Sequence, residues 1–319
     1  MAGGQDPGSH NGRHNGEHIK VSMRMTARRW IDIAIGHFTL LATILTVLML
    51  IAFAALLYWK AHPIFETHTL SDLIFSSVYM PSEGSFGFLN FILGTLWVTA
   101  LSMIIALPLS LLTALYLVEY APRWVRNVME PTVDLLAGIP SVVYGVWGVV
   151  VIVPFVQKIS THFPDSFSTG YSVLAGGIVL ALMIIPIMVS VMQEVLRTTP
   201  IGLREVSLSI GSNKWETTKY VVCRHASAGL VAACIMALSR AFGETMAVLM
   251  VVGNVPIAPT TVLDPAYPLP ALIANTYGEM MSVQMVEAAL MTAAVILLVL
   301  VVASQIFAKL VIRKMTNGS

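Results

Sequence analysis

The chain has 319 residues, of which 56% are hydrophobic and only 11% are charged, and its mean hydropathy is +0.80. Soluble domains usually carry about 25% charged residues, so this composition excludes a soluble globular protein and predicts an integral membrane protein. The net charge of +1 does not indicate nucleic-acid binding. The two cysteines, Cys223 and Cys234, lack metal or redox spacing, and we expect neither a metal nor a cofactor.

The chain is expected to have two parts, a tail over residues 1–29 and a membrane domain over residues 30–319. The first twenty residues are rich in Gly, Asn and His and poor in apolar residues, which predicts a disordered tail. The first apolar run starts near Ile31 and is too long for the core of a cleavable signal peptide, so no such peptide is expected.

Six apolar stretches are long enough to cross a bilayer, which takes about 20 residues. They cover about 31–57, 89–118, 135–157, 172–196, 226–253 and 286–310. The third contains Gly138 and Pro140, and the fourth contains Pro186. Breaks at such residues are tolerated where a helix lines a cavity or packs against protein. The predicted fold class is therefore an all-α integral membrane protein with six transmembrane helices.

The charges between these stretches predict the orientation. Fifteen of the eighteen Lys and Arg residues lie in the tail, in the second and fourth loops, and at the C-terminal end. Because basic residues accumulate on the cytoplasmic side, both termini and these two loops are expected in the cytoplasm. The other loops are acidic or uncharged and are expected on the outer face, where a partner or a plain connector fits equally well.

Two charges lie in the predicted fifth span. Arg240 and Glu244 are four residues apart, so they would share one face of a continuous helix. An ionisable residue in a membrane span is costly and marks a functional site by default. The alternative is a structural ion pair that fixes the rotation of the helix.

The fourth loop, residues 197–225, is predicted to contain two short amphipathic helices separated by Gly211. A glycine there fits the turn after a helix, because glycine readily adopts positive φ. The loop exposes Trp215 and the pair Val221–Val222, which favours docking onto another protein over a merely solvated loop. The sequence has no phosphate-binding G-x-x-x-x-G-K-[ST] motif, so energy for transport must come from a partner or an ion gradient.

Within this loop, Glu205-Val206-Ser207 followed by Gly211 resembles the coupling loop of bacterial ABC importer permeases. In that family the pattern is E-A-A, then Gly, then an ending in Leu-Pro, and the loop fits a cleft on the ATPase. Here Val206 and Ser207 replace the alanines and Cys223-Arg224 replace Leu-Pro. The resemblance implies that Glu205, Gly211 and Trp215 couple the chain to a separate ATPase.

Two further segments are similar to the phosphate-importer permeases of this family, of the PstC type. One is Arg240-Ala-Phe-Gly-Glu-Thr-Met-Ala-Val248, and the other is Ile139-Pro-Ser-Val-Val-Tyr-Gly145. The resemblance covers about Trp30 to the C-terminus. It implies a type I importer permease fold and a chain that is not itself an enzyme. The implied partners are a second permease in a heterodimer, two ATPase copies and an extracytoplasmic phosphate-binding protein.

A phosphate path needs hydrogen-bond donors or positive charge in limited number. Arg240 offers a planar fork suited to phosphate oxygens, and Glu244 is expected to pair with it while the path is empty. Thr245, Ser141 and Tyr144 are candidate neutral donors, although helix–helix hydrogen bonding or packing is the favoured explanation for each of them singly. Gly145 and Gly243 are expected to allow close helix approach.

Three other functions stay open from the residues alone. The chain could carry another oxyanion such as sulfate, molybdate or phosphonate. It could be a proton-driven secondary transporter in which Glu244 titrates, although such folds tend to show internal repeats and none is evident. It could also be a signalling protein whose cytoplasmic loop contacts a regulator.

Overall fold

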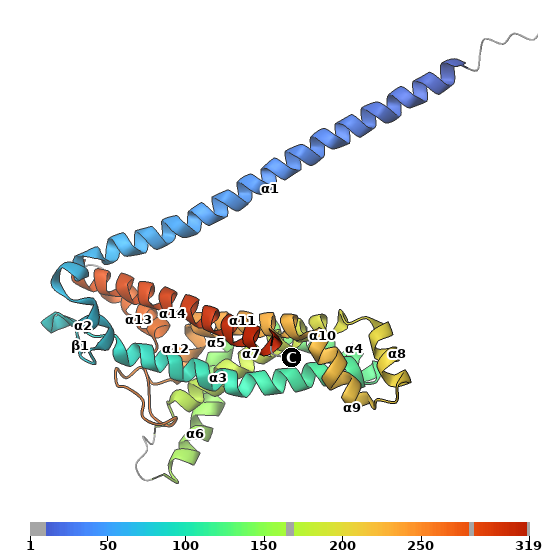
Figure 1. Ribbon diagram of the computed structural model, residues 1–319. Helices are drawn as coiled ribbons and strands as arrows, with labels where there is room; N and C mark the ends of the chain where they lie inside the picture. The colour runs from blue at the N-terminus through green and yellow to red at the C-terminus, as the bar shows by residue number, and fades with distance from the viewer. Residues whose placement is uncertain (1–10, 164–168, 281–283, 318–319) are drawn as a thin grey trace, which may run out of the picture. The chain divides into compact units, whose positions relative to one another are not determined.

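The computed structural model describes residues 11–163, 169–280 and 284–317, and the side chains of residues 33–163, 169–278 and 284–310. The chain divides into two compact units, residues 1–56 and residues 57–319. The boundary falls inside the first helix, α1 (Asn11–Thr67) (Figure 1). The fold is mostly helical, as expected.

The smaller unit holds most of α1. Its described side chains are almost all apolar and exposed, as suits a helix facing lipid or another subunit. A helix thus begins at Asn11, inside the segment for which we expect a disordered tail. Residues 1–10 of that segment lie outside the described residues, and the tail stays a prediction.

The larger unit is organised around two long helices, α3 (Leu89–Leu115) and α7 (Val173–Arg197), which pack along their lengths. The buried face of α3 is made largely of small residues at intervals of three or four: Thr95, Thr99, Ser102, Ala106, Ser110 and Ala114. Small residues let helix backbones approach closely, and van der Waals packing then holds the pair together in lipid. The main core cluster lies here, with Leu180, Ile184 and Met188 of α7 almost fully buried.

Besides α3 and α7, the described residues contain four helical stretches that could cross a membrane. They are α1, the stretch from Ser141 to Ser160, α14 (Gln284–Asn317), and a bent pair formed by Lys214–His225 and Ser227–Gly243. The elements after α3 are η2 (Tyr116–Tyr120), α4 (Arg123–Ala137), α5 (Ser141–Trp147), η3 (Gly148–Ile152) and α6 (Val153–Ser160). The fourth loop after α7 contains α8 (Ile201–Ser209), α9 (Lys214–Glu216), η4 (Thr217–Val222) and α10 (Cys223–His225). It is followed by α11 (Ser227–Gly243), α12 (Met246–Val251), α13 (Leu269–Met280) and α14. Within the described residues, five helices are long and apolar enough to span a bilayer, or six if a pair bent by 69° near residue 226 counts as one span.

Three predicted boundaries need correction. The third span begins at Ser141, because Gly138 and Pro140 separate it from α4. The fourth is unbroken, since α7 continues through Pro186. The fifth is interrupted, because α11 ends at Gly243 and the backbone of Glu244 is extended (φ −72°, ψ 126°) before α12 begins.

At one end of the larger unit, an aromatic core fixes the connection between α1 and α3 (Figure 1). It contains α2 (Leu70–Phe75), the strand β1 (Tyr79–Met80), the turn η1 (Pro81–Glu83) and the strand β2 (Ser85–Phe86). β1 and β2 pair antiparallel, with Tyr79 opposite Phe86. We call this the α2 end. It anchors α3 through Asn90, whose Nδ2 donates to the carbonyls of Ser77 (2.9 Å) and Pro256 (2.8 Å).

The segment 252–268 completes the α2 end. The Asp264 carboxylate accepts hydrogen bonds from the Thr260 amide (2.8 Å), the Thr260 hydroxyl (2.7 Å) and the Thr261 amide (2.8 Å). The Asp264 carbonyl in turn accepts from the first amide of α7, at Val173. Thr95 of α3 accepts from the Leu269 amide at 2.9 Å. These bonds satisfy backbone groups that an irregular segment leaves unpaired.

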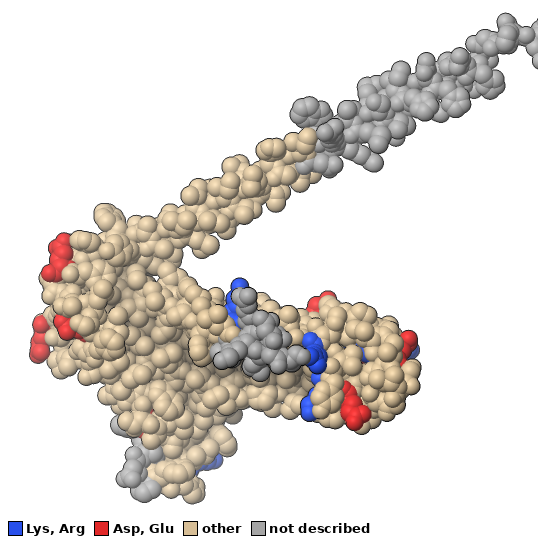
Figure 2. All heavy atoms as spheres, in the orientation of Figure 1, with Lys and Arg blue, Asp and Glu red and all other residues tan. Residues whose placement is uncertain are grey.

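The opposite end of the larger unit carries α4 and the fourth loop, and we call it the α8 end. Figure 2 shows mainly acidic side chains at the α2 end and charges of both signs at the α8 end, with a largely uncharged surface between them. Glu130 of α4 pairs with Arg197, the last residue of α7, and lies 3.8 Å from the Nε atom of Arg126. An apolar belt between two charged ends is the pattern expected of a membrane-spanning unit.

Candidate functional site

The fourth loop folds as two helical segments, as predicted. α8 (Ile201–Ser209) is followed by a turn at Gly211, and then by α9 (Lys214–Glu216), η4 (Thr217–Val222) and α10 (Cys223–His225), which form one continuous helical stretch. Gly211 has φ of +93°, and the amides of Gly211 and Ser212 donate to the carbonyls of Leu208 and Ser207. This is the glycine-dependent helix ending expected from the sequence.

The second helical segment begins with a reciprocal cap. The Glu216 amide donates to the Asn213 side chain, and the Asn213 amide donates to the Glu216 carboxylate, both at 2.9 Å. These two bonds satisfy amides that a helix start leaves free. The loop between α7 and α11 is therefore locally ordered by its own sequence.

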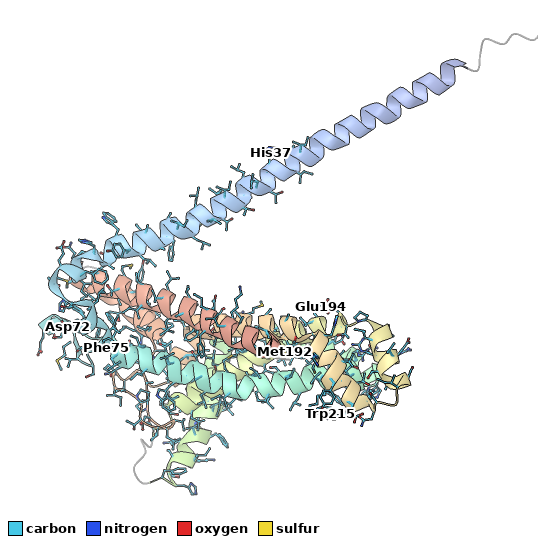
Figure 3. All side chains as sticks on the ribbon, viewed as in Figure 1. His37, Asp72, Phe75, Met192, Glu194 and Trp215 are labelled. Atoms are coloured by element: carbon cyan, nitrogen blue, oxygen red, sulfur yellow. The ribbon has the colours of Figure 1, made fainter. Side chains whose placement is uncertain are left out.

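The surface of this loop is apolar. Val206 and Trp215 have exposed fractions of 62% and 55%, and Ile201, Ile210 and Tyr220 are also exposed. Figure 3 shows Trp215 at the α8 end, among the outermost labelled side chains. The prediction that the loop exposes Val221 and Val222 is wrong, because Val221 is half-buried and Val222 is fully buried in the main core. An exposed cluster of large apolar side chains of this kind is typical of a docking surface.

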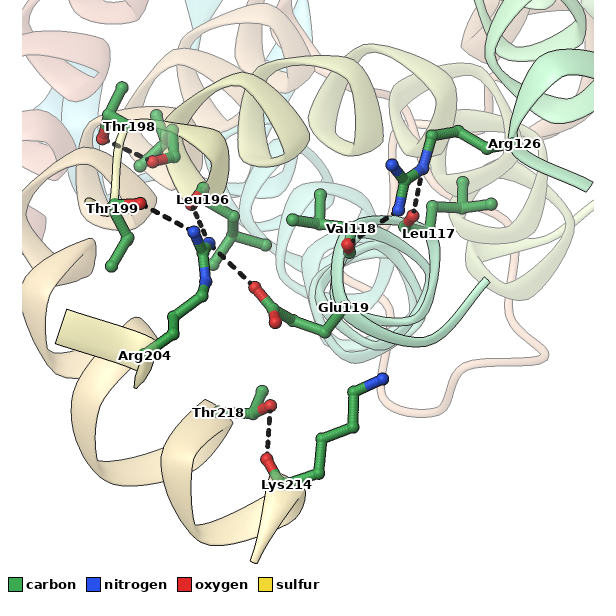
Figure 4. A network of polar contacts seen from close by, with 11 residues as sticks. Leu117, Val118, Glu119, Arg126, Leu196, Thr198, Thr199, Arg204, Lys214 and Thr218 are labelled. Carbon is green, nitrogen blue, oxygen red and sulfur yellow. Dashed lines mark hydrogen bonds and ion pairs between the residues drawn. The ribbon is translucent and has the colours of Figure 1, made fainter. Parts of the chain in front are cut away.

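Glu205 is exposed on α8, while its neighbour Arg204 turns inward (Figure 4). The Arg204 guanidinium donates to the Thr199 carbonyl (2.7 Å), the Leu196 carbonyl (3.1 Å) and the Glu119 carboxylate (2.9 Å). Sequence reasoning did not select Arg204 or Glu119. The available signal was a carboxylate, Glu119, directly after a long apolar stretch.

The Arg240–Glu244 pair takes a different form from the predicted one. The break at Glu244 ends the helix, so the two residues do not share a continuous helical face. The Glu244 carboxylate instead accepts a hydrogen bond from the Ala247 amide at 3.2 Å, which caps α12. Among the described residues no ion pair or hydrogen bond reaches the exposed Arg240 side chain. The expected intrachain pair is therefore wrong for this conformation.

The other candidate path residues lie on α5 and at the start of α12, which pack against each other. Tyr144 donates to the Leu136 carbonyl at 3.0 Å, and Thr245 donates to the Gly243 carbonyl at 3.3 Å. Ser141 is half-buried at the start of α5. The Tyr144 hydroxyl therefore bonds to the end of α4, and the Thr245 hydroxyl bonds to the end of α11.

The two glycines differ. A methyl group on Gly145 would lie 2.7 Å from the sulfur of Met250, so Gly145 permits the close approach of α5 and α12, as expected. Gly243 has no neighbour of this kind within 4 Å in this chain, so the same expectation is wrong for it.

These features define a class of protein: a helical integral membrane protein with an exposed apolar loop at one end and, among the described residues, an unpaired cation in an interrupted span. The sequence of residues 106–317 matches the family described as the inner membrane component of binding-protein-dependent transport systems. The chain belongs to that family.

Relatives of known name give the same assignment. The chain is 34% identical over 293 residues to the phosphate transport system permease protein PstC of Xylella fastidiosa strain Temecula1, covering 87% of this chain and 90% of that protein. It is 35% identical over 279 residues to the PstC protein of Mesorhizobium japonicum, covering 82% and 84%. It is 40% identical over 198 residues to the probable ABC transporter permease YqgH of Bacillus subtilis, covering 62% of each.

Solved structures support the fold. The chain resembles a chain of the MetNI methionine ABC transporter in an inward-facing conformation, with a TM-score of 0.55 and 21% identity. The match covers 74% of this chain and 99% of that one. At this level of identity the likeness concerns the architecture alone.

Proposed function

We propose that this chain is the membrane permease subunit of an ATP-driven phosphate importer. The observation that carries the proposal is its similarity, over most of both chains, to permeases named for phosphate transport. The chain forms part of the translocation path and does not hydrolyse ATP itself. A permease for another oxyanion would have the same architecture, so substrate identity rests on these relatives.

The orientation follows from the basic residues at the α8 end, which we place in the cytoplasm of a bacterial cell with its inner membrane around the apolar belt. Both termini are then cytoplasmic, and the chain crosses the membrane six times. The α2 end faces outward and receives an extracytoplasmic phosphate-binding protein. A second, non-identical permease completes the path.

The docking surface on the fourth loop fits the ATPase dimer. Trp215 supplies a large exposed anchor, Gly211 sets the angle between the two helical segments, and Glu205 offers a charge on the exposed face. Aromatic residues surrounded by apolar neighbours often dominate the energetics of an interface. Closure of the ATPases would then move the two loops of the permease pair together.

Arg240 is the candidate phosphate ligand in the path. Among the described residues its side chain has no hydrogen-bond or ion-pair partner, so its guanidinium is available to an oxyanion or to a carboxylate of the second permease. Ser141 remains a candidate, as do Glu244, Thr245 and Tyr144, which would each have to exchange an existing hydrogen bond for a substrate contact.

The test is uptake of labelled phosphate at low external concentration in cells that lack this chain. Wild-type chain should restore uptake that excess sulfate does not inhibit. Arg240→Gln should abolish it at normal membrane levels, and Arg123→Gln, at an exposed position at the start of α4, serves as a matched control outside the path and outside the fourth loop. Inhibition by sulfate would indicate another oxyanion, and abolition by a protonophore with ATP maintained would indicate a proton-driven carrier. Full uptake with Arg240→Gln would assign Arg240 a structural role.

A further inference from the structure

Within the described residues, α8 is attached to a distant part of the chain by an ion pair between Arg204 and Glu119. Arg204 has a side-chain exposure of 19% and Glu119 of 10%, so the pair is largely shielded from water. Two of the three hydrogen bonds of Arg204 go to carbonyls five and eight residues earlier in the chain, and they complete the end of α7. Only the bond to Glu119 joins α8 to a distant element, the turn η2 that directly extends α3.

A second contact joins the other half of the loop to the same turn. The Lys214 ammonium lies 4.8 Å from the centre of the Tyr120 ring, so α9 also contacts η2. Glu119 and Tyr120 are adjacent in sequence, and both halves of the loop therefore meet the end of α3 at one place (Figure 4 shows Glu119 and Lys214).

The two halves are also connected to each other. The hydroxyls of Ser207 on α8 and Thr217 on η4 lie 2.9 Å apart and are buried. A force on the exposed surface of α8 is thus shared with η4 through a bond that water does not reach. The two halves of the loop are therefore joined to each other as well as to η2.

η2 itself is held firmly at its end. Arg126 donates to the carbonyls of Leu117 (3.0 Å) and Val118 (2.9 Å), which the helix end would otherwise leave unpaired. Displacement of Glu119 is therefore passed to α3 and is not absorbed by fraying of its last turn.

We propose that Glu119 and Arg204 form the joint that transmits movement of the docked loop to α3, and so link ATP hydrolysis to opening of the path. They are positioning residues and touch neither nucleotide nor phosphate. The inference rests on the proposed function, because it requires an ATPase docked on the loop. This role would explain why a largely buried ion pair is present here, because docking of the loop onto an ATPase does not require one.

The experiment uses the whole importer in proteoliposomes: both permeases, the ATPase dimer and the phosphate-binding protein. Phosphate uptake and ATP hydrolysis are measured together for wild type, Glu119→Gln and Arg204→Lys. Glu119→Gln removes the negative charge of the pair and keeps its hydrogen-bonding capacity. Arg204→Lys keeps the positive charge but removes the guanidinium that reaches Glu119 and two carbonyls at once. We expect assembly and ATP hydrolysis to continue, while phosphate moved per ATP falls about tenfold, the factor that loss of a charge-assisted hydrogen bond supplies.

The matched control is Asp134→Asn. It removes a carboxylate charge from α4, where Asp134 accepts a hydrogen bond from Ser190 of α7 at 3.3 Å, without touching α8, η2 or Arg126. The control should keep the wild-type ratio. The proposal would be overturned if the phosphate moved per ATP were unchanged in Glu119→Gln and Arg204→Lys, or if it fell equally in the control. Failure of the proposed function is distinguishable, because the wild-type complex would then move no phosphate at all. If Glu119→Gln fails to assemble while Arg204→Lys assembles with a normal ratio, the pair is structural and the inference is wrong.

Discussion

The two ends of the larger unit are built by opposite strategies. At the α2 end, irregular segments are packed around aromatic side chains and their backbone groups are satisfied internally, as Asp264 and Asn90 illustrate. At the α8 end, the helical segments are regular, but their apolar side chains are exposed and a few polar contacts attach them. The first end is stabilised mainly by its own internal packing and hydrogen bonds, whereas the second is attached to the rest of the chain by few polar contacts. This difference predicts where a substitution damages the fold and where it damages assembly.

Two glycines with nearly equal φ give the largest expected contrast. Gly253 at the α2 end has φ of +97° and a methyl group there would lie 2.8 Å from Pro265, while Gly211 has φ of +93° and open space. Gly253→Ala should cost about 3 kcal/mol through backbone strain and overpacking, and Gly211→Ala about 1 kcal/mol through strain alone. Thermal unfolding of the purified importer measures both. Equal losses would contradict the proposed difference in packing.

Removal of one exposed aromatic should affect assembly alone. Trp215→Ala is expected to weaken binding of the ATPase by about 2 kcal/mol, a typical value for an aromatic anchor, with little change in unfolding temperature. Phe75→Ala, which removes an exposed aromatic at the α2 end, is the control and should leave ATPase affinity unchanged. Titration of the permease pair with ATPase checks the difference. Normal affinity in Trp215→Ala would remove Trp215 from the docking surface.

Acid should weaken the α2 end through Asp264. Burial raises the pKa of this carboxyl, but hydrogen bonds from Thr260 and Thr261 outweigh it and hold the pKa below its ordinary value. Its contribution to stability is therefore complete above pH of about 4 and is lost as the pH falls through the lowered pKa. Asp264→Asn should cost about 1.5 kcal/mol at neutral pH and flatten the decline below pH of about 4. Unfolding midpoints of both proteins between pH 3 and 7 test this; parallel curves would contradict it.

The smallest effect is expected at Tyr79. Its hydroxyl is buried and has no hydrogen-bond partner among the described residues, and burial raises its pKa to about 12. Tyr79→Phe should keep the ring contacts with Phe86 and Phe91 while removing an unsatisfied group, and stabilise the protein by about 1 kcal/mol. A loss of stability would indicate that the hydroxyl has a partner in the assembled importer.

The helical architecture and the shape of the fourth loop followed from local patterns. Apolar runs of membrane length and a glycine between two amphipathic segments determine structure within a few residues of themselves. The interruption at Glu244 did not follow, because four-residue spacing assumes an unbroken helix and the cap formed with Ala247 depends on the local backbone. The helix α13 was likewise not expected, because the segment before it is rich in proline and predicts irregular structure.

The candidate site could be predicted only in part for the same reason. Glu205, Gly211 and Trp215 belong to one contiguous motif, whereas Glu119 and Arg204 are 85 residues apart and meet only in three dimensions. The buried state of Val222 also depends on neighbours from other helices. The spacing of residues in the sequence does not predict which residues from distant parts of the chain come into contact.

Because α3 is attached at both of its ends, we expect it to move as one rigid helix. With 27 residues it is about 40 Å long, and a tilt of about 5° about its midpoint would move each end by about 2 Å. Asn90 ties one end to the outer segments and Glu119 ties the other to the fourth loop. A shift of that size is larger than a hydrogen bond tolerates, so the joints at both ends must travel with the helix or break. In the proposed orientation, α3 would therefore connect the side of the phosphate-binding protein with the side of the ATPase.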